Sequence, residues 1–241
     1  MLLVEYRYVL LEGFLQTLAL SAVVVVAATA VAIVMAYGLT RPSRLANRPV
    51  FLIVEVLRGI PWMVAVLLTY FVLPRIGIAL DPFWSTTVSI SLWGGANGAQ
   101  IIRAGLQSVP ATQRETAAAF GLRSWKGLLF VVLPQAMPVI LPPYIGLVTA
   151  LVQATSLGAV VGVHELLRSA QVLIEQTTIS RGGSPAFLVY GFILIVYFLL
   201  CWVVSRAGQV LERRFDRSGA AKARAEESPV PRHHPVDAAG R

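Results

Sequence analysis

The chain has 241 residues, of which 56% are hydrophobic and only 13% are charged. This composition, with a mean hydropathy of +0.72, excludes a soluble globular domain and indicates a polytopic membrane protein. The formal net charge of +8 is not a nucleic-acid signature, since the basic residues gather between the apolar runs. The single cysteine, Cys201, lies inside an apolar run, which excludes an intrachain disulfide.

Five candidate membrane spans appear as windows of about 20 apolar residues, the length that crosses a bilayer. They cover approximately residues 13–39, 50–73, 83–102, 139–163 and 186–204. The first run is too long for a cleavable signal peptide and lacks a basic region before it. We therefore expect an all-α membrane protein with a short N-terminal segment at residues 1–12 and a transmembrane domain at residues 13–217.

Basic residues are distributed unevenly between the segments that connect the spans. One set of segments contains Arg41, Arg44, Arg48, Arg103, Arg114, Arg123, Lys126, Arg206, Arg213, Arg214 and Arg217. The other set contains Arg7, Arg75, Arg168 and Arg181. Because cytoplasmic segments carry the excess of basic residues, we expect the N-terminus outside and the C-terminus in the cytoplasm.

Ionisable residues and a proline interrupt the second span. Glu55 and Arg58 are three positions apart and can share one helix face. Pro61 lacks a backbone donor and is expected to break or kink the helix. Broken helices with ionisable residues are typical of transport pathways, so both residues are candidates for a translocation path. The alternative is an interfacial start to the span, with Arg58 reaching the headgroups.

Polar residues also occur in the third and fourth spans. In the third span, the small residues of 94–99 favour close helix packing, and Asn97 and Gln100 either line a path or bond neighbouring helices. In the fourth span, Gln153, Thr155 and Ser156 fall at mid-membrane depth, where the same two roles are open.

The weakly apolar segment 110–135, between the third and fourth spans, predicts two short helices. Thr112 and Glu115 match a T-x-x-E capping box, and the alanines that follow favour helix. Gly121 is placed where a glycine at positive φ would end the first helix. A second helix is expected to start near Ser124 and to stop by Pro134.

The last part of the chain contains a predicted external helix, a span and a tail. Apolar residues at helical spacing within 162–181 predict an amphipathic helix near the outer surface. The apolar span at 186–204 continues as a basic helix end at 206–217. Residues 218–241 contain almost no large apolar side chains and are expected to form a disordered cytoplasmic tail.

Segment 110–135 resembles the EAA loop of ABC-importer permeases, whose pattern is E-A-A, three residues, G, nine residues, an aliphatic residue, any residue and L-P. The matching residues here are Gln113, Glu115-Thr116-Ala117, Gly121 and Val131-Val132-Leu133-Pro134, with the spacing intact. Thr116 stands where the family has alanine, and Thr112 where it has glycine. The resemblance implies a coupling helix that docks on a cytoplasmic ATPase. The alternative is an ordinary amphipathic loop of another membrane protein.

Further matches narrow the resemblance to polar amino-acid permeases of the histidine and glutamine type. Arg58-Gly59-Ile60-Pro61 resembles their R-G-T-P segment. Residues 153–157 keep the T-S-L half of their K-D-T-S-L pattern but lack its charged half. Because of this match, we favour path lining for Gln153, Thr155 and Ser156. Gln100 stands where members commonly have glutamate, which puts any electrostatic role there in doubt.

The resemblance implies a type I permease subunit of an ATP-driven importer for a polar amino acid, located in the bacterial plasma membrane. It also implies three partners, namely an ATP-binding subunit, a second permease that is identical or homologous, and an external solute-binding protein. The sequence has no G-x-x-x-x-G-K-[ST], H-E-x-x-H, C-x-x-C or G-x-S-x-G motif. We therefore expect a non-catalytic chain that binds no cofactor, with ATP hydrolysis in another subunit.

Three alternatives remain open. The departures at Gln100 and at Gln153-Ala154 leave room for another small solute, such as an opine, an ectoine-like compound or an amino-acid derivative. A membrane-embedded enzyme would need a paired acid and base, and only Glu55 with Arg58 approaches this. A scaffold or sensor without transport would tolerate changes of Thr155 and Ser156 without altered uptake.

Overall fold

The computed structural model describes residues 5–41 and 43–226, which form helices joined by short connections. The elements are α2 (Arg7–Leu39), α3 (Arg44–Gly59), α4 (Trp62–Phe71), η1 (Leu73–Ile76), α5 (Pro82–Ser108), α6 (Ala111–Ala119), α7 (Ser124–Gly127), η2 (Leu128–Val132), α8 (Leu133–Ala154), η3 (Thr155–Val161), α9 (Leu166–Arg181) and α10 (Ala186–Glu226). No strand occurs in these described ranges, so the prediction of an all-α fold is confirmed.

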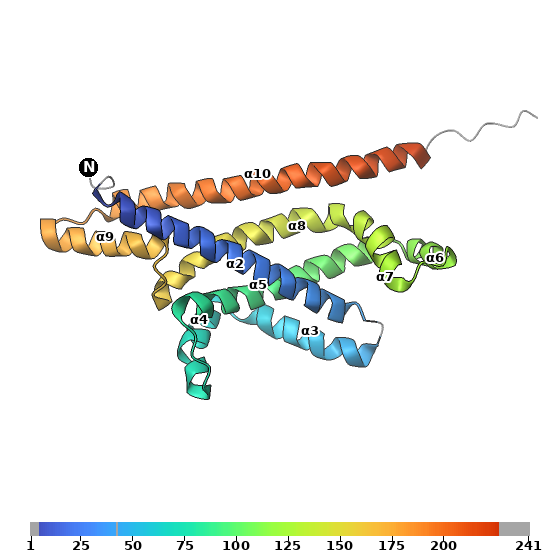
Figure 1. The fold of residues 1–241 in the computed structure, drawn as a ribbon, viewed down its shortest axis with the longest axis horizontal. Coiled ribbons are helices and arrows are strands. Elements are labelled where there is room, and N and C mark those ends of the chain that lie inside the picture. Colours follow the sequence, from blue (N-terminus) through green and yellow to red (C-terminus); the bar gives the residue numbers. More distant parts are fainter. Residues whose placement is uncertain (1–4, 42, 227–241) are drawn as a thin grey trace, which may run out of the picture.

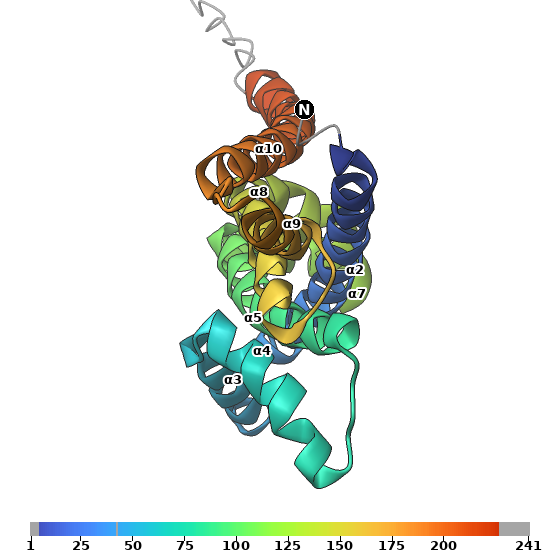
Figure 2. The same ribbon diagram turned by 90° about the vertical axis from the view of Figure 1, so that its left-hand side faces the viewer.

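Helix α5 occupies the centre of the fold. It packs against α2, α3, α4 and α8, and α8 packs in turn against α10. Figure 1 shows α9 and the N-terminus at one end of the molecule and α6 and α7 at the other. Figure 2 shows α3 and α4 on the side of α5 that faces away from α10. The largest buried cluster includes Leu20, Ile90 and Leu151, where α2, α5 and α8 meet.

Glycines in α5 allow its neighbours to approach closely. A Cβ atom added at Gly95 would lie 2.3 Å from Cγ1 of Val31 in α2. A Cβ atom at Gly94 would lie 2.6 Å from Cδ2 of Leu151 in α8. Both separations are shorter than van der Waals contact. At Gly95 the added atom would also lie 2.6 Å from the Cβ of Val31, which cannot rotate away, so this contact requires a residue without a side chain. The predicted packing role of the glycines in the third span is confirmed.

Fewer helices than expected meet the requirements of a membrane span. Within the described residues, three stretches are long and apolar enough, namely Arg7–Leu39, Trp125–Val161 and Ala186–Phe215. The pair Asn47–Gly59 and Trp62–Phe71 adds a fourth if it is counted as one span. The five predicted spans also included α5, which has sufficient length, 27 residues. It is too polar to qualify, and serines, threonines and glycines form most of its buried positions.

The second predicted span is broken at Pro61, as expected. Helix α3 ends at Gly59 and α4 begins at Trp62. The two helix axes differ by 99°. Pro61 is the N-cap residue of α4, with an extended ψ of 135°. The backbone N–H of an N-cap residue makes no hydrogen bond within its helix. The missing N–H of Pro61 therefore costs no helical hydrogen bond at the bend.

The expected helix end at Pro134 is wrong. The stretch from Trp125 to Val161 is continuous, with a π-helical turn at η2. The N–H of Leu133 donates to the carbonyl of Leu128, five residues back. Pro134 directly follows this widened turn. A proline has no backbone N–H to donate to an earlier carbonyl, so the helix continues past the wider turn without a lost donor at Pro134.

Both ends of the described chain are more helical than predicted. Helix α2 begins at Arg7, within the expected N-terminal segment, and α10 runs to Glu226. Residues 218–226 were expected to be disordered, but they are rich in alanine, lysine, arginine and glutamate. These residue types propagate a helix that the membrane span has already nucleated. Residues 227–241 of the predicted tail lie outside the described residues.

Candidate functional site

Helix α6 begins earlier than its sequence pattern predicts. Its N-cap is Pro110, and the N–H of Gln113 donates to the Pro110 carbonyl at 3.1 Å. Thr112 therefore lies within the first turn, and no side chain caps this helix. The predicted capping box of Thr112 and Glu115 is wrong. Pro110 begins the helix instead. Its fixed φ suits the residue that precedes the first helical turn, and no backbone N–H is needed at that position.

The end of α6 forms as predicted at Gly121. This glycine has a φ of +74°. Its N–H donates to the carbonyl of Ala118 at 2.9 Å, and the N–H of Leu122 donates to the carbonyl of Ala117 at 3.0 Å. The two bonds define a Schellman motif with Phe120 as the C-cap residue. The turn therefore fixes the direction in which the chain leaves α6.

Side chains tie α6 to two long helices. The Arg114 Nη2 donates to the carbonyl of Leu106 in α5 at 2.6 Å. The Gln135 Nε2 in α8 donates to the Gln113 Oε1 at 3.3 Å. Ala117 is buried and lies close to Gly127, the last residue of α7. A displacement of α6 would therefore pull on both α5 and α8.

The outer face of this loop is exposed and partly apolar. Thr112, Gln113, Glu115 and Thr116 are exposed, Pro134 is exposed at the start of α8, and Leu133 packs against the buried cluster around Leu106. Phe120 is 82% exposed and Trp125 is 55% exposed. Both aromatic side chains are therefore accessible to another molecule.

The structure brings together four of the predicted path residues, from α3 and α5. The Arg58 Nη1 donates to the Glu55 Oε1 at 2.8 Å, and the Arg58 Nε donates to the Asn97 Oδ1 at 3.2 Å. The Gln100 Nε2 donates to the same Glu55 oxygen at 3.2 Å. The ion pair is partly exposed, at 37% for Arg58 and 43% for Glu55. This polar cluster lies one turn before the bend at Pro61.

The other three predicted path residues lie where α8 changes to the 3₁₀ helix η3. Thr155 is fully buried, donates to the Val152 carbonyl at 2.7 Å and lies 3.4 Å from the Ser21 hydroxyl of α2. The Ser156 hydroxyl donates to the Gln153 carbonyl at 2.8 Å, and the Gln153 side chain is exposed. Thr155 thus bonds between helices, while Gln153 and Ser156 reach the surface of the subunit.

A buried carboxylate, Glu165, was not among the predicted site residues. It caps α9 by accepting from the N–H groups of Leu167 and Arg168, both at 2.9 Å. It also accepts from the Tyr197 hydroxyl of α10 at 2.7 Å and lies 3.5 Å from the Thr17 hydroxyl of α2. Burial raises the pKa of Glu165, and the hydrogen bonds to Leu167, Tyr197, Arg168 and Thr17 act in the opposite direction.

The capping role of Glu165 is visible in the local sequence. An acidic residue directly before a predicted amphipathic helix is a typical N-terminal cap and matches the positive end of the helix dipole. The contacts with α2 and α10 have no local signal, since Thr17 is 148 residues away.

Taken together, these features define a class of protein. Long apolar helices surround a polar central helix, one span is broken beside an ion pair, and a tethered loop presents aromatic residues at one end. This is the construction of a multi-pass membrane permease. The chain belongs to the family of binding-protein-dependent transport system inner membrane components, which matches residues 28–217. It is therefore a transport subunit of the bacterial plasma membrane.

Relatives of similar length support this assignment. The chain is 32% identical to the probable glutamine ABC transporter permease protein GlnP of Bacillus subtilis (strain 168), over 87% of this chain and 95% of the relative. It is 31% identical to the glutamine transport system permease protein GlnP of Escherichia coli (strain K12), over 85% and 92%. It is 34% identical to the L-cystine transport system permease protein TcyB of Bacillus subtilis (strain 168), over 68% of each chain.

Solved structures share the fold. A chain from a crystal structure of an amino acid ABC transporter with histidines matches with a TM-score of 0.77 and 25% identity, covering 88% of this chain and 96% of the other. A chain of the MetNI methionine ABC transporter in an inward-facing conformation matches with a TM-score of 0.70 and 20% identity, covering 86% and 96%. The predicted ABC-importer permease fold is confirmed.

Proposed function

We propose that this chain is the permease subunit of an ATP-driven importer and forms the translocation path for a polar amino acid. An external solute-binding protein delivers the substrate. The observation that carries the proposal is the α6 loop, which keeps the full E-x-A…G…L-P spacing and is bonded to both α5 and α8. The glutamine, cystine and amino-acid transporters named among the relatives support a polar amino acid as substrate.

The proposed mechanism is mechanical coupling through the α6 loop. In this account the loop lies in the cytoplasm and docks on an ATP-binding subunit through its exposed face, including Glu115 and Phe120. Movement of that subunit displaces α6. The bonds of Arg114 and Gln113 pass the displacement to α5 and α8. ATP in the partner thus biases a two-state equilibrium of the spans.

The chain itself performs no chemistry in this proposal. It binds no cofactor, and ATP hydrolysis takes place in the separate subunit. One wall of the path is formed by the polar cluster of Glu55, Arg58, Asn97 and Gln100, which is partly exposed on this subunit. A second permease, identical or homologous, closes the path across a two-fold or pseudo-two-fold axis. The N-terminus and α9 then face the outside.

A pull-down from native membranes in mild detergent, followed by mass spectrometry, tests the partners. We expect an ATP-binding subunit to co-purify and to be lost when Glu115 is replaced by arginine. A second, different permease in the same sample would identify a heteromeric pair, and its absence would identify a homodimer. If no ATP-binding subunit is recovered with the unmodified chain, the importer proposal is wrong.

Replacing Gly121 with valine is expected to uncouple transport from ATP hydrolysis. A β-branched residue at a φ of +74° costs about 1–3 kcal/mol in backbone strain. No atom lies within 4 Å of the added Cβ position, so the effect is confined to the backbone. If this strain acts on the coupling equilibrium, a cost of about 1–3 kcal/mol lowers uptake roughly 5- to 150-fold. ATP-dependent uptake in proteoliposomes is the measurement.

Gly121→Asn is the matched control for this variant, because asparagine tolerates positive φ. It should retain most of the uptake. Equal uptake by the valine variant and the unmodified chain, with both inserted at the same level, would show that the turn does not set the coupling geometry.

Replacing Arg58 with glutamine is expected to weaken substrate handling. The change leaves the Glu55 carboxylate without its cation and removes a charge-assisted bond to Asn97. The KM for uptake should rise by about ten-fold, which corresponds to about 1.4 kcal/mol. Arg75→Gln is the control, since Arg75 is an exposed arginine of η1. Unchanged KM in both variants would remove Arg58 from the proposed path.

A further inference from the structure

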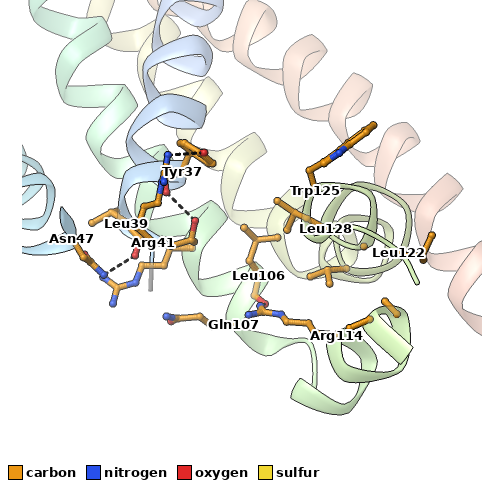
Figure 3. A pocket seen from close by; sticks show the side chains of 16 residues that line it. Tyr37, Leu39, Arg41, Asn47, Leu106, Gln107, Arg114, Leu122, Trp125 and Leu128 are labelled. Carbon is orange, nitrogen blue, oxygen red and sulfur yellow. Dashed lines mark hydrogen bonds between the residues drawn. The ribbon is translucent and has the colours of Figure 1, made fainter. Parts of the chain in front are cut away.

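A cavity of about 650 Å³ lies at the end of the molecule that carries α6 and α7. Its walls come from the end of α2, the start of α3, the end of α5 and the stretch from α6 to η2. Figure 3 shows Tyr37 and Arg41 on one side of this cavity and Arg114, Trp125 and Leu128 on the other. The volume is in the range of pockets that bind small molecules.

The polar part of the lining is strongly cationic. Arg41, Arg103 and Arg114 line the cavity, and none of its described lining residues is acidic. Arg41 donates to the Tyr37 hydroxyl at 2.7 Å and lies 4.5 Å from the centre of that ring. Arg114 donates to a backbone carbonyl, and Arg103 lies 6.0 Å from the Phe51 ring. The two ion pairs found in the described ranges involve none of these three arginines.

Three guanidinium groups in a cavity whose lining has no carboxylate favour an anionic ligand. Arginine donors match the oxygens of phosphate and carboxylate in a bidentate geometry. The rings beneath Arg41 and Arg103 hold these side chains in place without neutralising their charge. The cavity therefore has unused donor capacity that a phosphate group would satisfy.

The rest of the lining is suited to an amphiphile at a membrane boundary. Leu39 and Trp125 line the cavity and are also the end residues of two candidate spans. The ends of two candidate spans therefore meet at this cavity. Tyr37 and Trp125 are each more than half exposed. Tyrosine and tryptophan are enriched at the membrane interface. Leu106, Leu122 and Leu128 supply apolar walls.

We propose that this cavity binds the headgroup of an anionic phospholipid, with the arginines on its phosphate and the leucines against its glycerol and first acyl carbons. Basic pockets between helices at a membrane surface are suited to this ligand. The site lies on the inner side of α6, where Ala117 is buried and Arg114 bonds back to α5. It is distinct from the exposed face of α6 that the proposed function assigns to the ATPase.

Native mass spectrometry of the purified full chain, with any subunits that co-purify, tests this site. The protein is titrated in non-ionic detergent with phosphatidylglycerol and, separately, with phosphatidylcholine. We expect preferential retention of phosphatidylglycerol. The double variant Arg41→Gln and Arg103→Gln should weaken that retention by at least ten-fold and leave phosphatidylcholine unaffected.

Arg206→Gln is the matched control. Arg206 is also stacked on an aromatic ring, with 5.3 Å to the centre of Trp202, and does not line the cavity. It should bind phosphatidylglycerol like the unmodified chain. If the double variant unfolds, Arg41→Lys with Arg103→Lys keeps the charge and should keep the preference for the anionic lipid.

Several outcomes would overturn the proposal. Equal retention of the two lipids, or unchanged phosphatidylglycerol binding by the double variant, would exclude the site. Displacement of the lipid by millimolar inorganic phosphate would identify a site for a soluble anion instead. Displacement by the ATP-binding subunit would assign the cavity to that protein. Because the readout is lipid binding, a failure here is distinguishable from a failure of the transport proposal.

Discussion

Replacing Gly95 with alanine should destabilise the protein by about 1–3 kcal/mol. The new Cβ atom would lie 2.3 Å from Cγ1 and 2.6 Å from Cβ of Val31 in α2, and 3.2 Å from the Ala28 carbonyl oxygen. Cβ of Val31 is fixed by its backbone and cannot turn away. The helices α2 and α5 must therefore separate. Thermal unfolding of the purified protein, followed by tryptophan fluorescence, measures the loss.

Gly191→Ala provides a control with the same change in size. Gly191 lies in α10, and no atom lies within 4 Å of its added Cβ. Alanine also has the higher helix propensity, by up to about 1 kcal/mol. This variant should therefore be as stable as the unmodified chain or slightly more stable. If the two alanine variants unfold at the same temperature, α2 and α5 do not pack as closely as described.

Replacing Glu165 with alanine should have the largest effect on stability, about 3–5 kcal/mol. The change leaves two partly buried backbone N–H groups and the partly buried Tyr197 hydroxyl without their acceptor. Each unsatisfied buried group costs about 1–3 kcal/mol. Because Glu165 joins α9 to α2 and α10, hydrogen exchange should also increase throughout α9. Thermal unfolding and hydrogen exchange in the same detergent test both expectations.

Glu175→Ala is the control for the Glu165 variant. Glu175 lies on the same helix, but its carboxylate is 63% exposed and 3.9 Å from Arg168. An exposed pair of this kind contributes about 0–1 kcal/mol. Equal loss of stability in the two variants would mean that Glu165 is more hydrated than its surroundings indicate.

Local signals in the sequence predicted much of the site. Pro61 predicted the break in the second span, and the three-residue spacing of Glu55 and Arg58 predicted their shared face. The position of Gly121 predicted a left-handed turn. Each of these features depends on neighbours within one or two turns of helix, so the residues themselves are sufficient.

Other features depend on competing local choices that the sequence leaves open. The threonine at position 112 has the usual capping chemistry, but Pro110 begins the helix first because its φ is already fixed. Pro134 was expected to end a helix. The π turn before it lets the helix continue. In both places the effect of a proline depends on the backbone around it. The capping pattern at Thr112 and the helix-breaking tendency of Pro134 do not include that information.

Features built from distant parts of the chain were not predictable from one sequence. The pairing of Asn97 with Arg58 joins residues 39 positions apart. The bond of Tyr197 to Glu165 spans 32 positions, and the contact of Thr17 spans 148. The character of α5 follows the same rule. The packing role of its glycines was predicted, but the burial of its serines and threonines depends on neighbouring helices that are distant in the sequence.

ATP-dependent uptake by proteoliposomes tests directly whether this chain carries a polar amino acid across the membrane. The vesicles contain this chain with its co-purified subunits, ATP is supplied on the side of α6, and the cognate binding protein presents a panel of labelled amino acids on the other side. We expect accumulation of at least one polar amino acid, and we expect it to require ATP, the binding protein and an intact Gly121 turn. Accumulation of an opine or ectoine-like solute instead would correct the substrate. No ATP-dependent accumulation of any solute, with the ATPase present and active, would contradict the account.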